Sequence, residues 1–169
     1  MDHPATQRAK RRGLDERFKQ ELGNLQFVEI DLINEASPAH HFDNTPTVFM
    51  IEGVLMYIPE SKVIDLLDSL RASPIDRLAV IFSFMTQWPD GGSGFMPRSR
   101  LIELWRAWSK EPFAWALEPA LMSDFLSSRG FKLEEIVLCR DLAGSQTKLD
   151  GENIVFCTKQ GPADDSASP

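Results

Sequence analysis

Residues 47–60, TVFMIEGVLMYIPE, constrain the fold of this chain more than any other stretch. The apolar run 48–51 is short and β-branched enough to predict a strand buried on both faces. An acid and a glycine, Glu52 and Gly53, follow where that strand would end. After Pro59, a residue favoured in the first turn of a helix, apolar residues recur at helical spacing. The stretch therefore predicts half of a βαβ unit with its polar residues at the strand's carboxyl end, where open α/β sheets bind ligands.

The rest of the chain alternates expected helices and strands. Helices are expected at 5–22, 59–72, 98–109 and 118–129, and strands at 26–32, 48–51, 78–84, 131–138 and 153–159. A turn-rich loop joins the last two strands, which predicts an antiparallel pair. The small polar residues 161–169 predict a disordered tail. This order indicates one α/β domain over residues 1–160, with a sheet that is parallel except for one antiparallel C-terminal strand.

Composition argues against several classes of partner. The formal net charge of −7 and the pI of about 5.0 disfavour nucleic acid and anionic membrane. No apolar run approaches the roughly 20 residues that span a membrane. Cys139 and Cys157 lie far apart in apolar runs, which indicates buried free thiols of a reducing compartment and a cytoplasmic protein. His40 and His41 lack acids or cysteines at ligand spacing, so no metal site is expected.

Three carboxylates, Asp2, Asp31 and Glu52, fall at or beside the ends of expected strands. A parallel sheet aligns such strand ends along one edge, and a carboxylate that accepts two hydrogen bonds suits the hydroxyls of a ribose or an amine. A helix cap or a solvated turn would explain each acid taken singly. No nucleophile and base stand at recognisable spacing, so the catalytic residues are left open. Tyr57 lines a substrate or belongs to the core, and the core is favoured.

Residues 2–10 (DHPATQRAK), 27–32 (FVEIDL) and 52–59 (EGVLMYIP) resemble three motifs of the leucine carboxyl methyltransferase-like family. Its members are class I S-adenosylmethionine-dependent methyltransferases and include many bacterial O-methyltransferases. The resemblance implies a Rossmann-like sheet with helices on both faces, S-adenosyl-L-methionine as cofactor, and methyl transfer to a hydroxyl or carboxylate of a small molecule. It also implies that Asp2 holds the ribose hydroxyls, that Asp31 and Leu32 flank the adenine, and that Glu52 lies near the ribose and methionine.

The chain departs from the family pattern at its start. It begins inside the first matched motif, so it lacks the family's first strand with its glycine-rich turn and most of the second strand. In the family these strands are central, and their loss would leave an unpaired sheet edge. We therefore expect a C-terminal fragment with an incomplete cofactor site, which could associate with another copy through that edge. Two rivals are a non-catalytic remnant or partner-binding module, and a nicotinamide-linked oxidoreductase, whose glycine fingerprint is absent.

Overall fold

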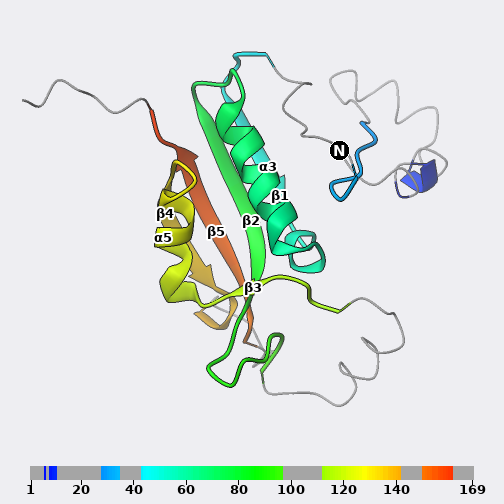
Figure 1. Cartoon of the computed structure of the whole chain (residues 1–169), viewed down its shortest axis with the longest axis vertical. Helices are drawn as coiled ribbons and strands as arrows, with labels where there is room; N and C mark the ends of the chain where they lie inside the picture. The colour runs from blue at the N-terminus through cyan, green and yellow to red at the C-terminus, as the bar shows by residue number, and fades with distance from the viewer. Residues whose placement is uncertain are drawn as a thin grey trace, which may run out of the picture.

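The computed structural model describes residues 6, 8–10, 28–34, 43–96, 112–141 and 150–161 (Figure 1). Its elements form an α/β arrangement in which strands and helices alternate. They are β1 (Thr47–Ile51), η2 (Leu55–Tyr57), α3 (Glu60–Ala72), β2 (Leu78–Thr86), β3 (Ala116–Leu117), η3 (Pro119–Leu121), α5 (Met122–Ser127), β4 (Phe131–Leu138), η4 (Cys139–Asp141) and β5 (Glu152–Lys159).

The five strands form one sheet in the order β1-β2-β5-β4, with β3 also paired to β2. Strands β1 and β3 run parallel to β2, whereas β5 runs antiparallel to both β2 and β4. This confirms the expected parallel sheet with one antiparallel C-terminal strand. Strand β1 pairs with β2 as far as Phe82, and β3 pairs with Met85 and Thr86 on the stretch of β2 that β1 has left.

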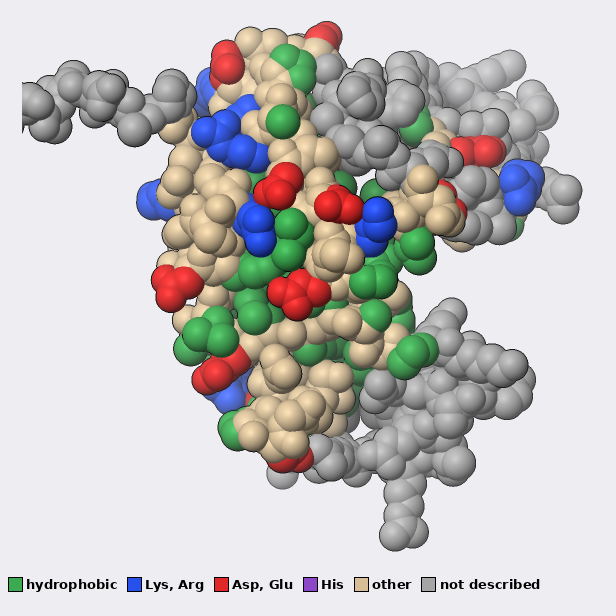
Figure 2. Space-filling view, viewed as in Figure 1, with side chains coloured by type: hydrophobic (Ala, Val, Ile, Leu, Met, Phe, Trp, Pro, Cys, Tyr) green, Lys and Arg blue, Asp and Glu red, His purple; other side chains and the backbone are tan. Residues whose placement is uncertain are grey.

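The core lies on the face of the sheet that carries the helices. Alternate β2 residues Val80, Phe82 and Phe84 are buried in one cluster with apolar residues of α3 and α5. Because both helices contribute to this cluster, both cover the same face, and Figure 1 shows α3 lying across β1 and β2. Figure 2 shows acidic and basic side chains around apolar ones on this side of the molecule. The expected helices on both faces are thus seen on one face within the described residues.

The opposite face of the sheet exposes apolar side chains. Val48 and Met50 of β1 are 63% and 69% exposed, and Phe156 of β5 is 36% exposed. Met50, Ile81 and Phe156 stand in register across three strands, so these residues form one apolar row. The prediction that β1 is buried on both faces is therefore wrong. Helix α3 covers only the face of β1 that carries Phe49 and Ile51, and no described element covers the other.

A lysine ties the end of β5 to the end of α3. The Lys159 Nζ donates hydrogen bonds to the carbonyl oxygens of Ser73, at 2.8 Å, and of Ile75, at 2.9 Å. Partial burial, followed by repulsion from Arg71, lowers the pKa of the Lys159 amine. These bonds satisfy carbonyls beyond the last turn of α3 and so fix the helix against the sheet.

Several expected elements differ in detail. The strand expected at 26–32 is absent from the described residues 28–34, where Glu29 forms an isolated bridge and 32–34 form a turn. None of the described strands pairs with these residues, and a strand requires a backbone partner. Helix α3 confirms the second expected helix, with Pro59 as its N-cap. The fourth expected helix, at 118–129, is shorter in the structure, because Pro119 opens a 3₁₀ turn before α5.

The first expected helix is seen at residue 6 and residues 8–10, while 98–109 and 162–169 lie outside the described residues. Strands β2, β4 and β5 confirm the remaining expected strands and their antiparallel final pair. Within the part of the chain that the structure describes, no helix is long and apolar enough to cross a membrane.

Candidate functional site

The carboxyl end of β1 presents an acid and a turn. Glu52 is exposed and forms no hydrogen bond or ion pair with the described residues. Gly53 has φ of 67°, a left-handed conformation that favours glycine. Its N–H donates to the Ser83 Oγ of β2 at 2.8 Å. This bond fixes the point where the chain leaves the sheet, so Glu52 is held at the sheet's carboxyl edge with its carboxylate in solvent.

Asp31 holds its own turn. Its Oδ1 accepts the N–H groups of Ile33 and Asn34 at 3.0 and 3.3 Å, and its Oδ2 accepts the Asn34 Nδ2 at 2.9 Å. This is the arrangement of an aspartate that caps a turn. Leu32, the next residue, is partly buried against the core. No hydrogen bond or ion pair between described residues joins Asp31 to Glu52, and Asp2 lies outside the described residues. The cofactor-binding roles of all four residues therefore stay predictions.

Helix η2, which follows Glu52 and Gly53, is bonded to a distant segment. The Met56 carbonyl oxygen accepts the N–H groups of Ala114 and Trp115 at 2.8 and 3.2 Å. As a result Phe113 lies beside Tyr57, with ring centroids 5.6 Å apart. Phe113 also lies 6.2 Å from the ring centroid of Phe95. All three rings are partly exposed, and Tyr57 is not among the buried core residues, so the prediction that it belongs to the core is wrong.

Sequence reasoning missed Phe95 and Phe113 as candidate site residues. They lie in irregular segments that carry no periodic pattern, and only the tertiary structure brings them to Tyr57. Trp115, by contrast, is 2% exposed. Its indole packs on Phe82 and Phe84 with ring centroids about 6 Å away, and thus belongs to the core.

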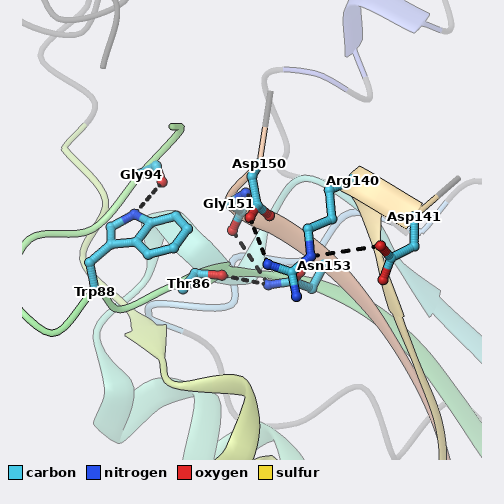
Figure 3. A network of polar contacts seen from close by, with 8 residues as sticks. All are labelled: Thr86, Trp88, Gly94, Arg140, Asp141, Asp150, Gly151 and Asn153. Atoms are coloured by element: carbon cyan, nitrogen blue, oxygen red, sulfur yellow. Dashed lines mark hydrogen bonds and ion pairs between the residues drawn. The ribbon is translucent and has the colours of Figure 1, made fainter. Parts of the chain in front are cut away.

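The loop 87–96 is anchored over the carboxyl end of β2 (Figure 3). Met96 and Asp150 exchange two backbone hydrogen bonds of 2.7 Å, and the Trp88 Nε1 donates to the Gly94 carbonyl oxygen at 2.9 Å. Gly151, with φ of 129°, packs directly on the loop. A Cβ there would press on the Gly94 carbonyl oxygen and lie 3.1 Å from the Phe95 Cα. The loop's position, and with it that of Phe95, therefore depends on a glycine at 151.

A buried polar pair lies beneath this loop. The Asn153 Nδ2 donates to the Thr86 Oγ1 at 2.8 Å, and Asn153 is fully buried. Its Oδ1 accepts no hydrogen bond from the described residues. Arg140 flanks the pair and bonds the Asp150 carboxylate at 3.2 Å (Figure 3). The network joins the ends of β2, β4 and β5, so it supports the edge on which the candidate site lies.

Both cysteines are free thiols, as expected, but only Cys157 is buried, and the prediction that Cys139 is buried is wrong because it is partly exposed. Burial, and then the nearby Glu134, raise the pKa of Cys157 to about 12. Burial also raises the pKa of Cys139, with smaller contributions from Glu152 and Asp150. A thiol with a raised pKa is a poor nucleophile at neutral pH, so neither cysteine suits covalent catalysis. Among the described residues, no group of three acids, histidines or cysteines could hold a metal ion; the absence of a metal stays a prediction.

The open sheet, with β1, β2 and β4 parallel and β5 reversed beside β4, is the class I methyltransferase fold. Three solved structures share it. TnmH is 12% identical with a TM-score of 0.57 over 94% of this chain and 41% of its own. An O-methyltransferase family protein from Burkholderia thailandensis is 14% identical with a TM-score of 0.57, over 95% and 42%. Human N-acetylserotonin methyltransferase, solved in complex with SAM, is 15% identical with a TM-score of 0.54, over 95% and 39%.

Residues 1–71 match the leucine carboxyl methyltransferase family. The matched range contains Asp2, Asp31, Leu32 and Glu52, so the resemblance noted from the three motifs is confirmed. No curated protein matches the chain. The chain spans about two fifths of the length of the solved structures named above. The described residues thus have the class I methyltransferase fold, and residues 1–71 resemble this methyltransferase family.

Proposed function

We propose that this chain forms part of an S-adenosylmethionine-dependent O-methyltransferase whose acceptor is a hydroxyl or carboxylate of a small molecule. The observation that carries the proposal is the exposed Glu52 beside the left-handed Gly53 at the carboxyl end of β1. This acid lies within the range that matches the family. A solvated carboxylate at that place can accept hydrogen bonds from the hydroxyls or the amine of the cofactor. Asp2, Asp31 and Leu32 are proposed to hold its ribose and adenine.

Methyl transfer to an oxygen does not require a pair of catalytic residues. When bound, S-adenosylmethionine would supply an electrophilic methyl group. The residues of this chain would align the acceptor oxygen with it and exclude water, which accounts for a large part of the rate in such transfers. The acceptor's proton passes to solvent or to a general base. Among the described residues, the carboxyl edge with Glu52 and the anchored loop 87–96 can supply this positioning.

We further propose that more polypeptide completes the cofactor site. Within the described sheet, β1 pairs with β2 alone and is therefore an edge strand, to which a further strand can pair. The exposed Val48 and Met50 stand beside that edge, and exposed apolar residues at an open edge mark an interaction surface. The fold-sharing structures are also more than twice as long. A second copy that pairs along β1 would be the simplest such partner.

Calorimetric titration with S-adenosylmethionine tests the cofactor site. We expect measurable binding that is weaker than low micromolar, because the site is incomplete. Glu52→Ala should weaken binding about tenfold or more, since hydrogen bonds to a charged group contribute about 1.5–3 kcal/mol. Glu135→Ala, an exposed acid of β4, is the matched control and should leave affinity unchanged. Absence of binding to folded protein would refute the proposed function. Low micromolar binding by the monomer would refute only the proposal that the cofactor site is incomplete.

Sedimentation across a concentration series tests the open edge. If copies associate through β1, Met50→Lys should shift the protein towards monomer while the thermal midpoint stays close to that of the wild type. Its exposed side chain makes such a change tolerable. Leu121→Lys, an exposed apolar residue of η3, is the control. A wild-type monomer at every concentration would refute self-association.

The alternative is a non-catalytic remnant or a partner-binding module, which the apolar row of the sheet favours. It predicts association that depends on Met50 without any heat of cofactor binding. In either case we propose a cytoplasmic location, supported by the two free thiols.

A further inference from the structure

Three partly exposed aromatic rings, Tyr57, Phe113 and Phe95, form a contiguous row that we term the aromatic row. Neighbouring ring centroids lie 5.6 and 6.2 Å apart, with interplanar angles of 38° and 70°. The three residues come from η2, the segment before β3 and the loop after β2. Unlike Phe82 and Phe84, which are at most 1% exposed, these rings keep part of their surface in solvent. The row is therefore distinct from the aromatic core.

The aromatic row lies at the same edge of the sheet as Glu52. Tyr57 lies five residues after Glu52, in the helix that starts as the chain leaves β1. Phe113 is held there by the bonds from Ala114 and Trp115 to the Met56 carbonyl. Phe95 is held by the anchors of the loop 87–96 on Asp150 and Gly151. Three separate backbone attachments thus present the rings beside the proposed cofactor edge.

We propose that the methyl acceptor is a planar aromatic compound that carries the reacting hydroxyl or carboxylate, and that its ring packs on the aromatic row. This inference rests on the proposed function and names its substrate class. Aromatic rings at centroid distances of about 4.5–7 Å gain about 0.5–1.5 kcal/mol beyond the burial of area. The three rings are tilted or edge-on to one another, and a flat π-system can make such ring contacts whereas a saturated ring cannot. Sites for small ligands are commonly lined in this way, with few polar groups.

The chain offers a specific reporter, because Tyr57 is its only tyrosine. NMR of protein labelled in the tyrosine ring therefore gives a single ring system at the proposed site. The probes are 2-naphthol and its saturated counterpart decahydro-2-naphthol, titrated with S-adenosylhomocysteine present. We expect 2-naphthol to shift the Tyr57 signal saturably and to bind about 3- to 10-fold more tightly than decahydro-2-naphthol. Equal affinities, or no saturable shift with 2-naphthol, would overturn the proposal.

Variants locate the site. Phe113→Leu should weaken 2-naphthol about 3- to 10-fold, whereas Leu121→Ala, an exposed apolar residue of η3, should leave it unchanged. Equal loss in both variants would also overturn the proposal, and the comparison of probes on wild-type protein holds even if Phe113→Leu misfolds. Cofactor affinity, measured by calorimetry on the same samples, separates the two proposals. Binding of S-adenosylmethionine without 2-naphthol selectivity refutes the aromatic acceptor alone, and lack of cofactor binding refutes the proposed function.

Discussion

Replacing Gly151 by alanine should detach the loop 87–96 from the sheet. At φ of 129°, alanine adopts a conformation that costs about 1–3 kcal/mol. The added Cβ would also press on the Gly94 carbonyl oxygen, 3.0 Å from the Gly94 carbonyl carbon and 3.1 Å from the Phe95 Cα. These are backbone atoms, so relief requires the loop to move and to lose one or both Met96–Asp150 hydrogen bonds, at about 1 kcal/mol each. The expected loss is about 2–5 kcal/mol, a large part of a stability of about 5–15 kcal/mol.

Gly91→Ala is the matched control, because Gly91 lies in the same loop with φ of 78° and a Cβ added there would meet no atom within 4 Å. Its expected loss is the backbone strain alone, about 1–2 kcal/mol. Urea unfolding measures both, and Gly151→Ala should lower the midpoint by about 1–2 M. It should also move the Tyr57 ring signal, since Phe95 would leave Phe113. Equal losses in the two variants would refute the reasoning that close packing, and not only strain, requires glycine at 151.

Further predictions concern residues outside the loop 87–96. Lys159→Met should lower the free energy of unfolding by about 2 kcal/mol in urea, because two carbonyls beyond α3 lose their donor. Only Cys139 should react with Ellman's reagent in native protein at pH 8. Because the pKa of Cys157 is raised from 9.0 to about 12 by burial and then by Glu134, the unfolded thiol ionises first. Stability should therefore fall between about pH 9 and 12, and Cys157→Ala should reduce that fall. Asn153→Asp should destabilise more than Asn153→Leu in thermal melts, because it places a charge at a fully buried site.

Sequence patterns correctly predicted the helices and strands that pack against other described elements. Strands β1 and β2 and helix α3 follow from apolar runs and from helical spacing, and each is packed against the others. The strand predicted at 26–32 is not seen in residues 28–32, where Glu29 forms an isolated bridge and no described strand pairs with the segment. The prediction that β1 is buried on both faces also failed, because Val48 and Met50 are exposed. An apolar run does not indicate whether a second layer covers the other face of the strand. The spacing of apolar residues indicates which secondary structure a segment favours. Whether a strand forms also depends on the neighbouring strands and on the layers that cover it.

Some features of the candidate site also follow from the sequence, and others follow only from the tertiary structure. The sequence by itself determined the fold class, the family resemblance and the place of Glu52, because an acid and a glycine directly after a short apolar run form a local pattern. Only the tertiary structure decided that Tyr57, Phe113 and Phe95 form one row. These contacts join irregular segments across the sheet, and they depend on backbone bonds to Met56 and Asp150 that no spacing in the chain encodes. Local chemistry sets which groups a strand end can offer, and long-range packing sets which of them meet.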